Sequence, residues 1–144
     1  MGRRRELSGA KKRFLTARLV TLAGPGGVGK TRLSLRLAAQ LRRNFPDGFW
    51  FVELAEMREP ALLAGTARKA LDLREQGTVE SADALAAHLR DRRLLLVLDN
   101  FEHPTRHVAQ LTSRLLKAGS EVRILATSRE PLGLVEEHVV PVPH

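Results

Sequence analysis

The sequence contains no cysteine, and this absence excludes a disulfide framework, a zinc site built on cysteine and a thiol nucleophile. It also has no apolar segment near the roughly 18 residues that a membrane-spanning helix requires. The longest aliphatic run covers only residues 94–98, a length that suits a buried strand. The basic N-terminal region is not followed by the apolar stretch and cleavage site of an export signal, so we expect a cytoplasmic location.

What the chain does contain is typical of one soluble globular domain. Its 144 residues are 43% hydrophobic and 28% charged, and neither value is unusual. The net charge is +8, but residues 1–18 alone contain seven cations against one acid, Glu6. A basic terminal segment can bind nucleic-acid phosphates or anionic lipid, or it can be the solvated face of a helix. We favour the solvated face and expect neither direct DNA binding nor membrane binding from these residues.

Hydrophobic periodicity along the chain alternates between strand and helix patterns. Strands are expected at residues 18–23, 49–54, 94–99 and 122–127, with a fifth candidate at 138–142. Helices are expected at residues 5–16 and 30–43, and near 60–71, 81–89 and 108–115. Gly119 follows the last helix as a C-cap, and Pro141 favours a sheet edge for the last strand. This alternation predicts an α/β fold with a parallel sheet that helices cover on both faces.

Residues 24–31 match the phosphate-binding pattern G-x-x-x-x-G-K-[ST] at every fixed position. The glycines allow the backbone to curl so that successive N–H groups point at an anion. The pattern lies between an expected strand and an expected helix, and the N-terminal dipole of that helix adds to the attraction. Lys30 can reach the β- and γ-phosphates of a nucleotide, and the Thr31 hydroxyl can bind Mg²⁺. We therefore predict a nucleotide phosphate site here.

Two further strands are expected to end at the same edge of the sheet as this loop. The first ends in Asp99, whose carboxylate can hold Mg²⁺ together with Thr31. The next residue, Asn100, can orient a water molecule but cannot accept its proton at neutral pH, although it can also be a simple strand-end turn. The second strand leads into Arg129, which can sense a γ-phosphate or can be a surface arginine. The expected catalytic set is therefore Asp99, Asn100 and Arg129.

Four stretches, residues 18–33, 45–55, 92–103 and 123–133, resemble the NB-ARC nucleotide-binding domain of STAND ATPases. The likeness is to bacterial transcriptional regulators of the antibiotic-regulatory and large LuxR-type kinds. It implies a three-layer P-loop NTPase fold with the strand order 2-3-4-1-5, and a G-R-x-x-E-like element at residues 2–6 that lies near the adenine and ribose. The cofactor-binding residues implied are Arg3, Gly24, Gly26, Gly27, Val28, Gly29, Lys30, Thr31 and Arg32.

The same resemblance divides the chain into a basic N-terminal helix, residues 1–17, and a P-loop nucleotide-binding domain, residues 18–144. Members of the family continue into a helical domain with a G-x-P motif and then a winged helix, which help to enclose ADP. This sequence ends before those parts. We therefore expect a piece of a longer regulator, with signal sensing, DNA binding and any oligomerisation assigned to the missing parts.

The predicted function is a switch module that binds ATP or ADP with Mg²⁺ and is at most a slow ATPase. One alternative is a faster catalytic P-loop ATPase or a small-molecule kinase, although no arginine-bearing lid of the kind a kinase needs is evident. A GTPase would need the guanine-reading motif N-K-x-D, which is absent. A second alternative is a nucleic-acid-binding module through residues 3–18, which salt-dependent DNA retention in the presence of saturating ATP would favour.

Overall fold

The computed structural model describes residues 4–14, 16–27, 29–53, 89–99 and 106–143. In chain order the described elements are α1 (Arg4–Arg13), β1 (Leu19–Ala23), α2 (Lys30–Leu41), the short 3-10 helix η1 (Arg42–Asn44), β2 (Phe49–Glu53), β3 (Leu95–Asp99), α5 (Arg106–Ala118), β4 (Arg123–Ser128) and β5 (Glu137–Pro141). The strand bounds agree with the expected ones to within a residue. The helices expected near residues 60–71 and 81–89 lie, apart from Leu89, outside the described residues.

Two helix ends differ from the expected bounds. The first helix ends at Arg13 instead of residue 16, because Thr16 and Ala17 both donate their backbone N–H groups to the Arg13 carbonyl and turn the chain toward β1. The second helix ends at Leu41, and a tighter 3-10 turn follows it in place of a further helical turn. Both differences lie in terminal turns, where local hydrophobic periodicity specifies the backbone least.

The five described strands form one parallel sheet in the order β2-β3-β4-β1-β5. The α/β prediction and the strand order implied by the resemblance are confirmed, and β5 lies at an edge of the sheet as Pro141 predicted. Because all strands run in one direction, their carboxyl ends meet at one edge. There Asp99 lies beside Thr127, and Ala23 lies beside Ser128.

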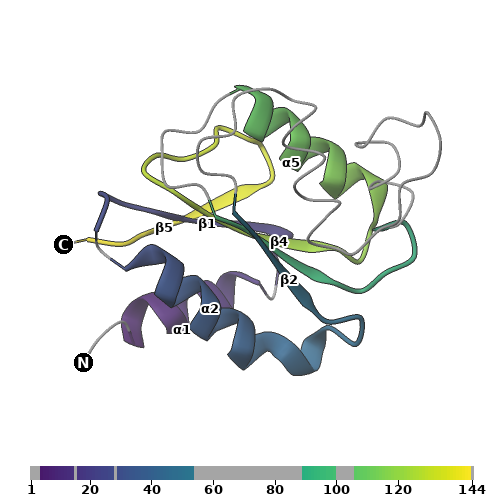
Figure 1. Cartoon of the computed structure of the whole chain (residues 1–144), viewed down its shortest axis with the longest axis horizontal. Coiled ribbons are helices and arrows are strands. Elements are labelled where there is room, and N and C mark those ends of the chain that lie inside the picture. The colour runs from purple at the N-terminus through teal and green to yellow at the C-terminus, as the bar shows by residue number, and fades with distance from the viewer. Residues whose placement is uncertain (1–3, 15, 28, 54–88, 100–105, 144) are drawn as a thin grey trace.

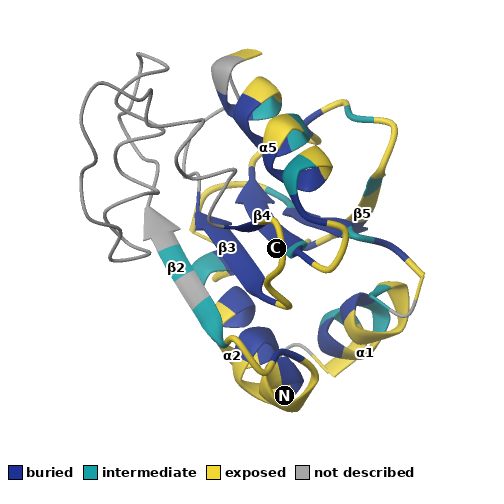
Figure 2. Ribbon diagram, turned by 90° about the vertical axis from the view of Figure 1, so that its right-hand side faces the viewer, coloured by how far each residue is buried: buried dark blue, intermediate teal, exposed yellow. Residues whose placement is uncertain are grey.

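Helices cover both faces of the sheet, with α1 and α2 on one side and α5 on the other (Figure 1). Alternate residues of β3 divide between two hydrophobic clusters. Leu95 and Val97 belong to the cluster that includes α2, whereas Leu96 and Leu98 belong to the cluster that includes α5. Buried residues make up most of the central strands and the helix faces toward the sheet, whereas exposed residues lie on the outer helix surfaces and on the connecting loops (Figure 2). Among the described helices, none has the length and apolar character to cross a bilayer.

Arg18 has a structural role at the carboxyl end of α5. Its Nη2 atom donates to the carbonyl oxygens of Leu116 at 2.7 Å, Val122 at 3.2 Å and Gly119. A cation at this end of a helix is favourable because the terminal carbonyls carry partial negative charge. Gly119 itself is not the left-handed C-cap that we expected. Its φ lies outside the left-handed region, and glycine is required because a Cβ would lie 2.4 Å from the Leu89 carbonyl oxygen.

Candidate functional site

The loop between β1 and α2 depends on glycine for two different reasons. Gly27 and Gly29 adopt φ values of 80° and 87°, in the left-handed region that favours glycine. Gly24 is instead restricted by a close approach, because an added Cβ would lie 2.2 Å from the carbonyl oxygen of Val142. The loop therefore packs directly against the chain that leaves β5.

Lys30 begins α2, and its side chain folds back over the preceding loop. Its Nζ atom donates to the carbonyl oxygens of Gly24, at 2.6 Å, and Pro25, at 2.9 Å. Only 8% of the residue is exposed. This burial lowers the pKa of the Lys30 ammonium from its ordinary value, and the nearby positive charge of Arg129 lowers it further, whereas Asp99 opposes the shift. The ammonium is thus held in the loop by neutral acceptors, which an anionic oxygen can replace.

Asp99 ends β3 and is fully buried. Its Oδ1 atom accepts hydrogen bonds from the Thr31 hydroxyl at 2.9 Å and from the Thr127 hydroxyl at 2.5 Å. The second bond follows from the parallel register, which places Asp99 directly beside Thr127. The other carboxylate oxygen, Oδ2, is buried without a hydrogen-bond partner. A buried carboxylate oxygen without a partner is unfavourable, so this atom is suited to receive a cation.

A cavity of about 700 Å³ opens beside Lys30, Thr31 and Thr127. Its volume is within the size range of small-molecule and cofactor sites. Arg129 reaches it from the end of β4, and its Nη2 atom approaches the loop at Gly26, where an added Cβ would lie 3.0 Å away. The residues that line the cavity are Gly26, Gly27, Gly29, Lys30, Thr31, Arg32, Leu35, Thr127 and Arg129. The cavity is therefore bordered by cations and by the N-terminus of α2.

Most of the site residues expected from the sequence lie together in this region. Seven of them line the cavity: Gly26, Gly27, Gly29, Lys30, Thr31, Arg32 and Arg129. Asp99 is not among the lining residues and contacts the site through Thr31. Gly24 lies against Val142. Three others, Arg3, Val28 and Asn100, lie outside the described residues.

Thr127 and Leu35 also line the cavity, although neither belongs to the predicted set. Leu35 follows Thr31 by one helical turn, so the spacing of α2 could have indicated it. Thr127 lies at the strand end where the sequence offers a hydroxyl or the Arg129 guanidinium as a γ-phosphate sensor, although only Arg129 entered the predicted set. Its contact with Asp99 depends on which strands are neighbours and on their register, and neither is readable from periodicity.

The sequence and the fold of this chain were both matched to known proteins. The family model described as AAA domain matches residues 13–132. The chain belongs to the AAA domain family. This AAA domain is 46% identical over 128 residues to a protein of Mycobacterium tuberculosis named as an HTH-type transcriptional regulator. The match covers 88% of the chain but only 14% of that protein, so the chain spans a small part of its relative's length.

Two solved structures resemble this AAA domain in fold. Cdc6p from Pyrobaculum aerophilum aligns with a TM-score of 0.68 at 16% identity, over 96% of this chain and 45% of that one. A STAND protein with a tetratricopeptide repeat sensor from Pyrococcus horikoshii aligns with a TM-score of 0.58 at 16% identity, over 99% of this chain and 23% of that one. At such low identity these likenesses establish the P-loop fold alone.

Proposed function

We propose that this AAA domain is the nucleotide-binding switch module of an NB-ARC-like, STAND-type transcriptional regulator. It binds ATP or ADP with Mg²⁺ and hydrolyses ATP slowly. The observation that carries the proposal is the combination of Lys30 on the phosphate loop with Asp99 behind Thr31, at the edge of one cavity. The regulatory setting is taken from the HTH-type relative and from the NB-ARC resemblance, and it concerns the longer protein.

The phosphate groups of the nucleotide would bind at the N-terminus of α2. Backbone N–H groups of the loop and the helix dipole favour an anion at this position. Lys30 would exchange its two carbonyl acceptors for phosphate oxygens, so that its ammonium would bond to ionised acceptors in place of neutral ones. Loading with nucleotide therefore releases the carbonyl groups of Gly24 and Pro25 and ties the lysine to the ligand.

The residues present fit a magnesium ion. Mg²⁺ prefers oxygen ligands and is usually held by one or two carboxylates, water and the phosphates of the nucleotide. Asp99 offers a buried oxygen without a partner, and the Thr31 hydroxyl lies beside it. The ion would offset the charge of the phosphates when bound.

Three residues have roles that rest on position or on the resemblance. Arg129 would contact the γ-phosphate, because its guanidinium already lies against the loop at Gly26. We assign Asn100 to orienting the attacking water, and Arg3 to the adenine and ribose, from the resemblance. The basic helix at residues 1–17 and the P-loop unit at residues 18–144 remain our proposed division of the chain.

The metal assignment is tested by calorimetry of ATP binding with and without Mg²⁺. The wild-type protein is expected to bind ATP at least about tenfold more tightly with Mg²⁺, a difference of about 1.4 kcal/mol. Asp99→Asn should bind ATP with the same affinity in both conditions.

Asp91→Asn is the matched control, since Asp91 is exposed and precedes the opposite end of β3. It should keep the full effect of Mg²⁺ on ATP affinity. A full Mg²⁺ effect in Asp99→Asn would contradict the role of Asp99 as the metal-holding carboxylate.

Hydrolysis by this domain is expected to be slow, because Asn100 cannot act as a general base. General-base assistance typically contributes about 10²–10⁴-fold. Steady-state phosphate release should therefore lie well below the enzyme median of roughly 10 per second. Turnover at or above that value, abolished by Lys30→Ala, would instead support a faster catalytic ATPase.

A further inference from the structure

The charges of this protein are unevenly divided along the chain. Residues 1–46 hold 12 of the 24 lysine and arginine residues but only one of the 16 aspartate and glutamate residues, Glu6. The remaining residues, 47–144, hold the other 12 cations and 15 acids. The first third of the chain is therefore strongly basic, whereas the rest is slightly acidic.

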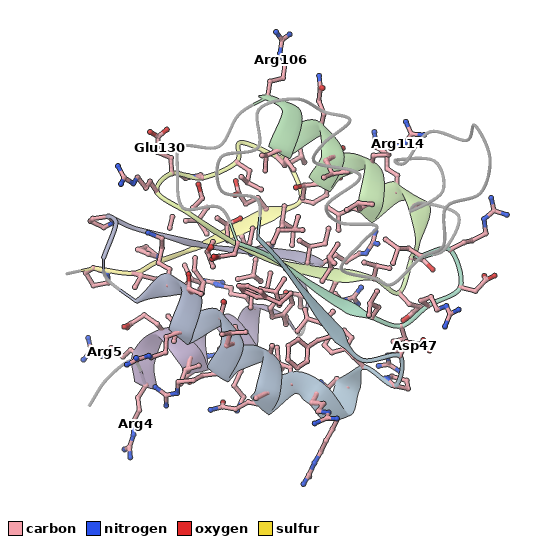
Figure 3. The ribbon with its side chains drawn as sticks, in the orientation of Figure 1. Arg4, Arg5, Asp47, Arg106, Arg114 and Glu130 are labelled. Carbon is pink, nitrogen blue, oxygen red and sulfur yellow. The ribbon has the colours of Figure 1, made fainter. Side chains whose placement is uncertain are left out.

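The fold gathers this basic segment on one side of the sheet, since α1, α2 and η1 form the helical layer opposite α5 (Figure 1). Arg4 and Arg5 extend from α1 away from the sheet (Figure 3). We call the exposed cations of this layer, apart from those at the nucleotide cavity, the basic face. Its members are Arg4, Arg5, Lys11, Lys12, Arg13, Arg36, Arg42 and Arg43. One carboxylate in the layer, that of Glu6, is too few to neutralise them.

A groove of about 420 Å³ lies between the two helices on this face. Its lining residues are Arg4, Leu7, Ser8, Lys11, Arg36 and Gln40. Three of these side chains are cations, and Ser8 and Gln40 add neutral hydrogen-bond donors, which together suit phosphate oxygens. None of the six lines the nucleotide cavity, so the groove is a separate site.

We propose that this groove and the flanking basic face bind the phosphodiester backbone of duplex DNA without reading its sequence. The cations extend along α1, with Arg36 on α2 and two more on η1, and Arg4 and Lys11 are seven residues apart, roughly 10 Å along α1. That spread suits a row of phosphates better than one small anion. Nonspecific DNA binding consists mainly of such contacts between cations and phosphates.

A lipid surface fits this face less well than DNA. A helix that lies in a membrane interface needs an exposed apolar side to insert. The apolar residues Leu7 and Ala10 of α1 are buried against the protein core. The sequence alone did not favour DNA, because a basic terminal segment is more often the solvated face of a helix, and because residues 2–6 resemble an element near the adenine and ribose. The groove exists only because the fold sets α1 beside α2, which contributes Arg36 and Gln40.

The experiment measures binding of a fluorescently labelled 20-base-pair duplex by anisotropy across a series of salt concentrations. Saturating ADP and Mg²⁺ are present throughout, so that the nucleotide site cannot hold DNA phosphates. We expect a dissociation constant on the order of 10⁻⁵ M and the same affinity for a second duplex of unrelated sequence. Phosphate contacts from the three groove cations, Arg4, Lys11 and Arg36, predict a slope of about −2.7 in log K against log salt concentration, and each further contact from the flanking basic face steepens it by about 0.9.

The test variant is the pair Lys11→Gln and Arg36→Gln, both at exposed positions in the groove. It should weaken DNA binding at least tenfold at low salt and reduce the magnitude of the slope by about 1.8. The control pair, Arg106→Gln and Lys117→Gln, makes the same change in net charge on exposed positions of α5. It should retain the wild-type slope. The affinity of both pairs for ADP should be unchanged.

Several outcomes would overturn the proposal. Equal weakening by the two pairs would mean that net charge alone attracts DNA. Absence of salt-dependent binding, or binding to vesicles containing phosphatidylglycerol without binding to the duplex, would exclude this DNA surface. If the test pair fails to fold, the single variant Arg4→Gln provides the same test with an expected slope change of about 0.9. If the other cavity did not bind ADP, the contrast between the two pairs would still test the groove, because no member of either pair lines that cavity.

Discussion

Lys30→Ala is expected to weaken ATP binding by about 1.5–3 kcal/mol, or roughly 10- to 150-fold. Lys30 is the cation best placed to meet phosphate oxygens, because it begins α2 and is held in the phosphate loop by the carbonyls of Gly24 and Pro25. Alanine keeps the helix but removes the charge-assisted hydrogen bonds to the ligand. Isothermal titration calorimetry with ATP and Mg²⁺ measures the loss.

The control for this variant is Lys117→Ala, which removes an exposed lysine from the last turn of α5, on the other side of the sheet. It should bind ATP as the wild-type protein does. Thermal melting of both variants separates a binding defect from a folding defect. An unchanged ATP affinity in folded Lys30→Ala would refute the assignment of this loop as the phosphate site.

The second large effect is expected from Gly24→Ala, which should destabilise the protein by up to about 3 kcal/mol. The new methyl group would lie 2.2 Å from the carbonyl oxygen of Val142. Neither backbone can move away freely, because the Val142 N–H group donates to Ala23 and the Gly24 N–H group donates to Ser128. The added methyl group should therefore strain the two hydrogen bonds that join the start of the phosphate loop to β4 and to the chain after β5. Denaturant unfolding of the empty protein measures the change in free energy.

Gly9→Ala is the matched control, because it is the same substitution at a glycine with open space. Gly9 lies inside α1, and an added Cβ would meet no heavy atom within 4 Å. Alanine there should stabilise the protein by about 0.5–1 kcal/mol, since glycine loses more backbone entropy in a helix. Equal stability of Gly24→Ala and the wild-type protein would show that the chain after β5 can shift away from the loop.

The sequence by itself was sufficient for the α/β class and the five described strands, and it predicted a phosphate site at residues 24–31. These features are local. Eight consecutive residues carry the loop pattern, and hydrophobic periodicity specifies each strand or helix within its own segment. The end of a strand could likewise be read locally, which identified Asp99 and Arg129 as residues at the carboxyl edge. The strand order came from resemblance to a family, because periodicity does not show which strands are neighbours.

The tertiary structure decided which of these separate features meet. Thr31 reaches Asp99 across 68 positions of the chain, and the parallel register brings Thr127 to the same carboxylate. The close approach that restricts Gly24 comes from residues after β5, and the basic groove requires α1 to lie beside α2. Such contacts depend on strand order, register and helix packing, which are determined only when the complete hydrophobic core packs together. No local segment contains that information, so only the folded chain brings these separate residues together into the candidate nucleotide site and the basic face.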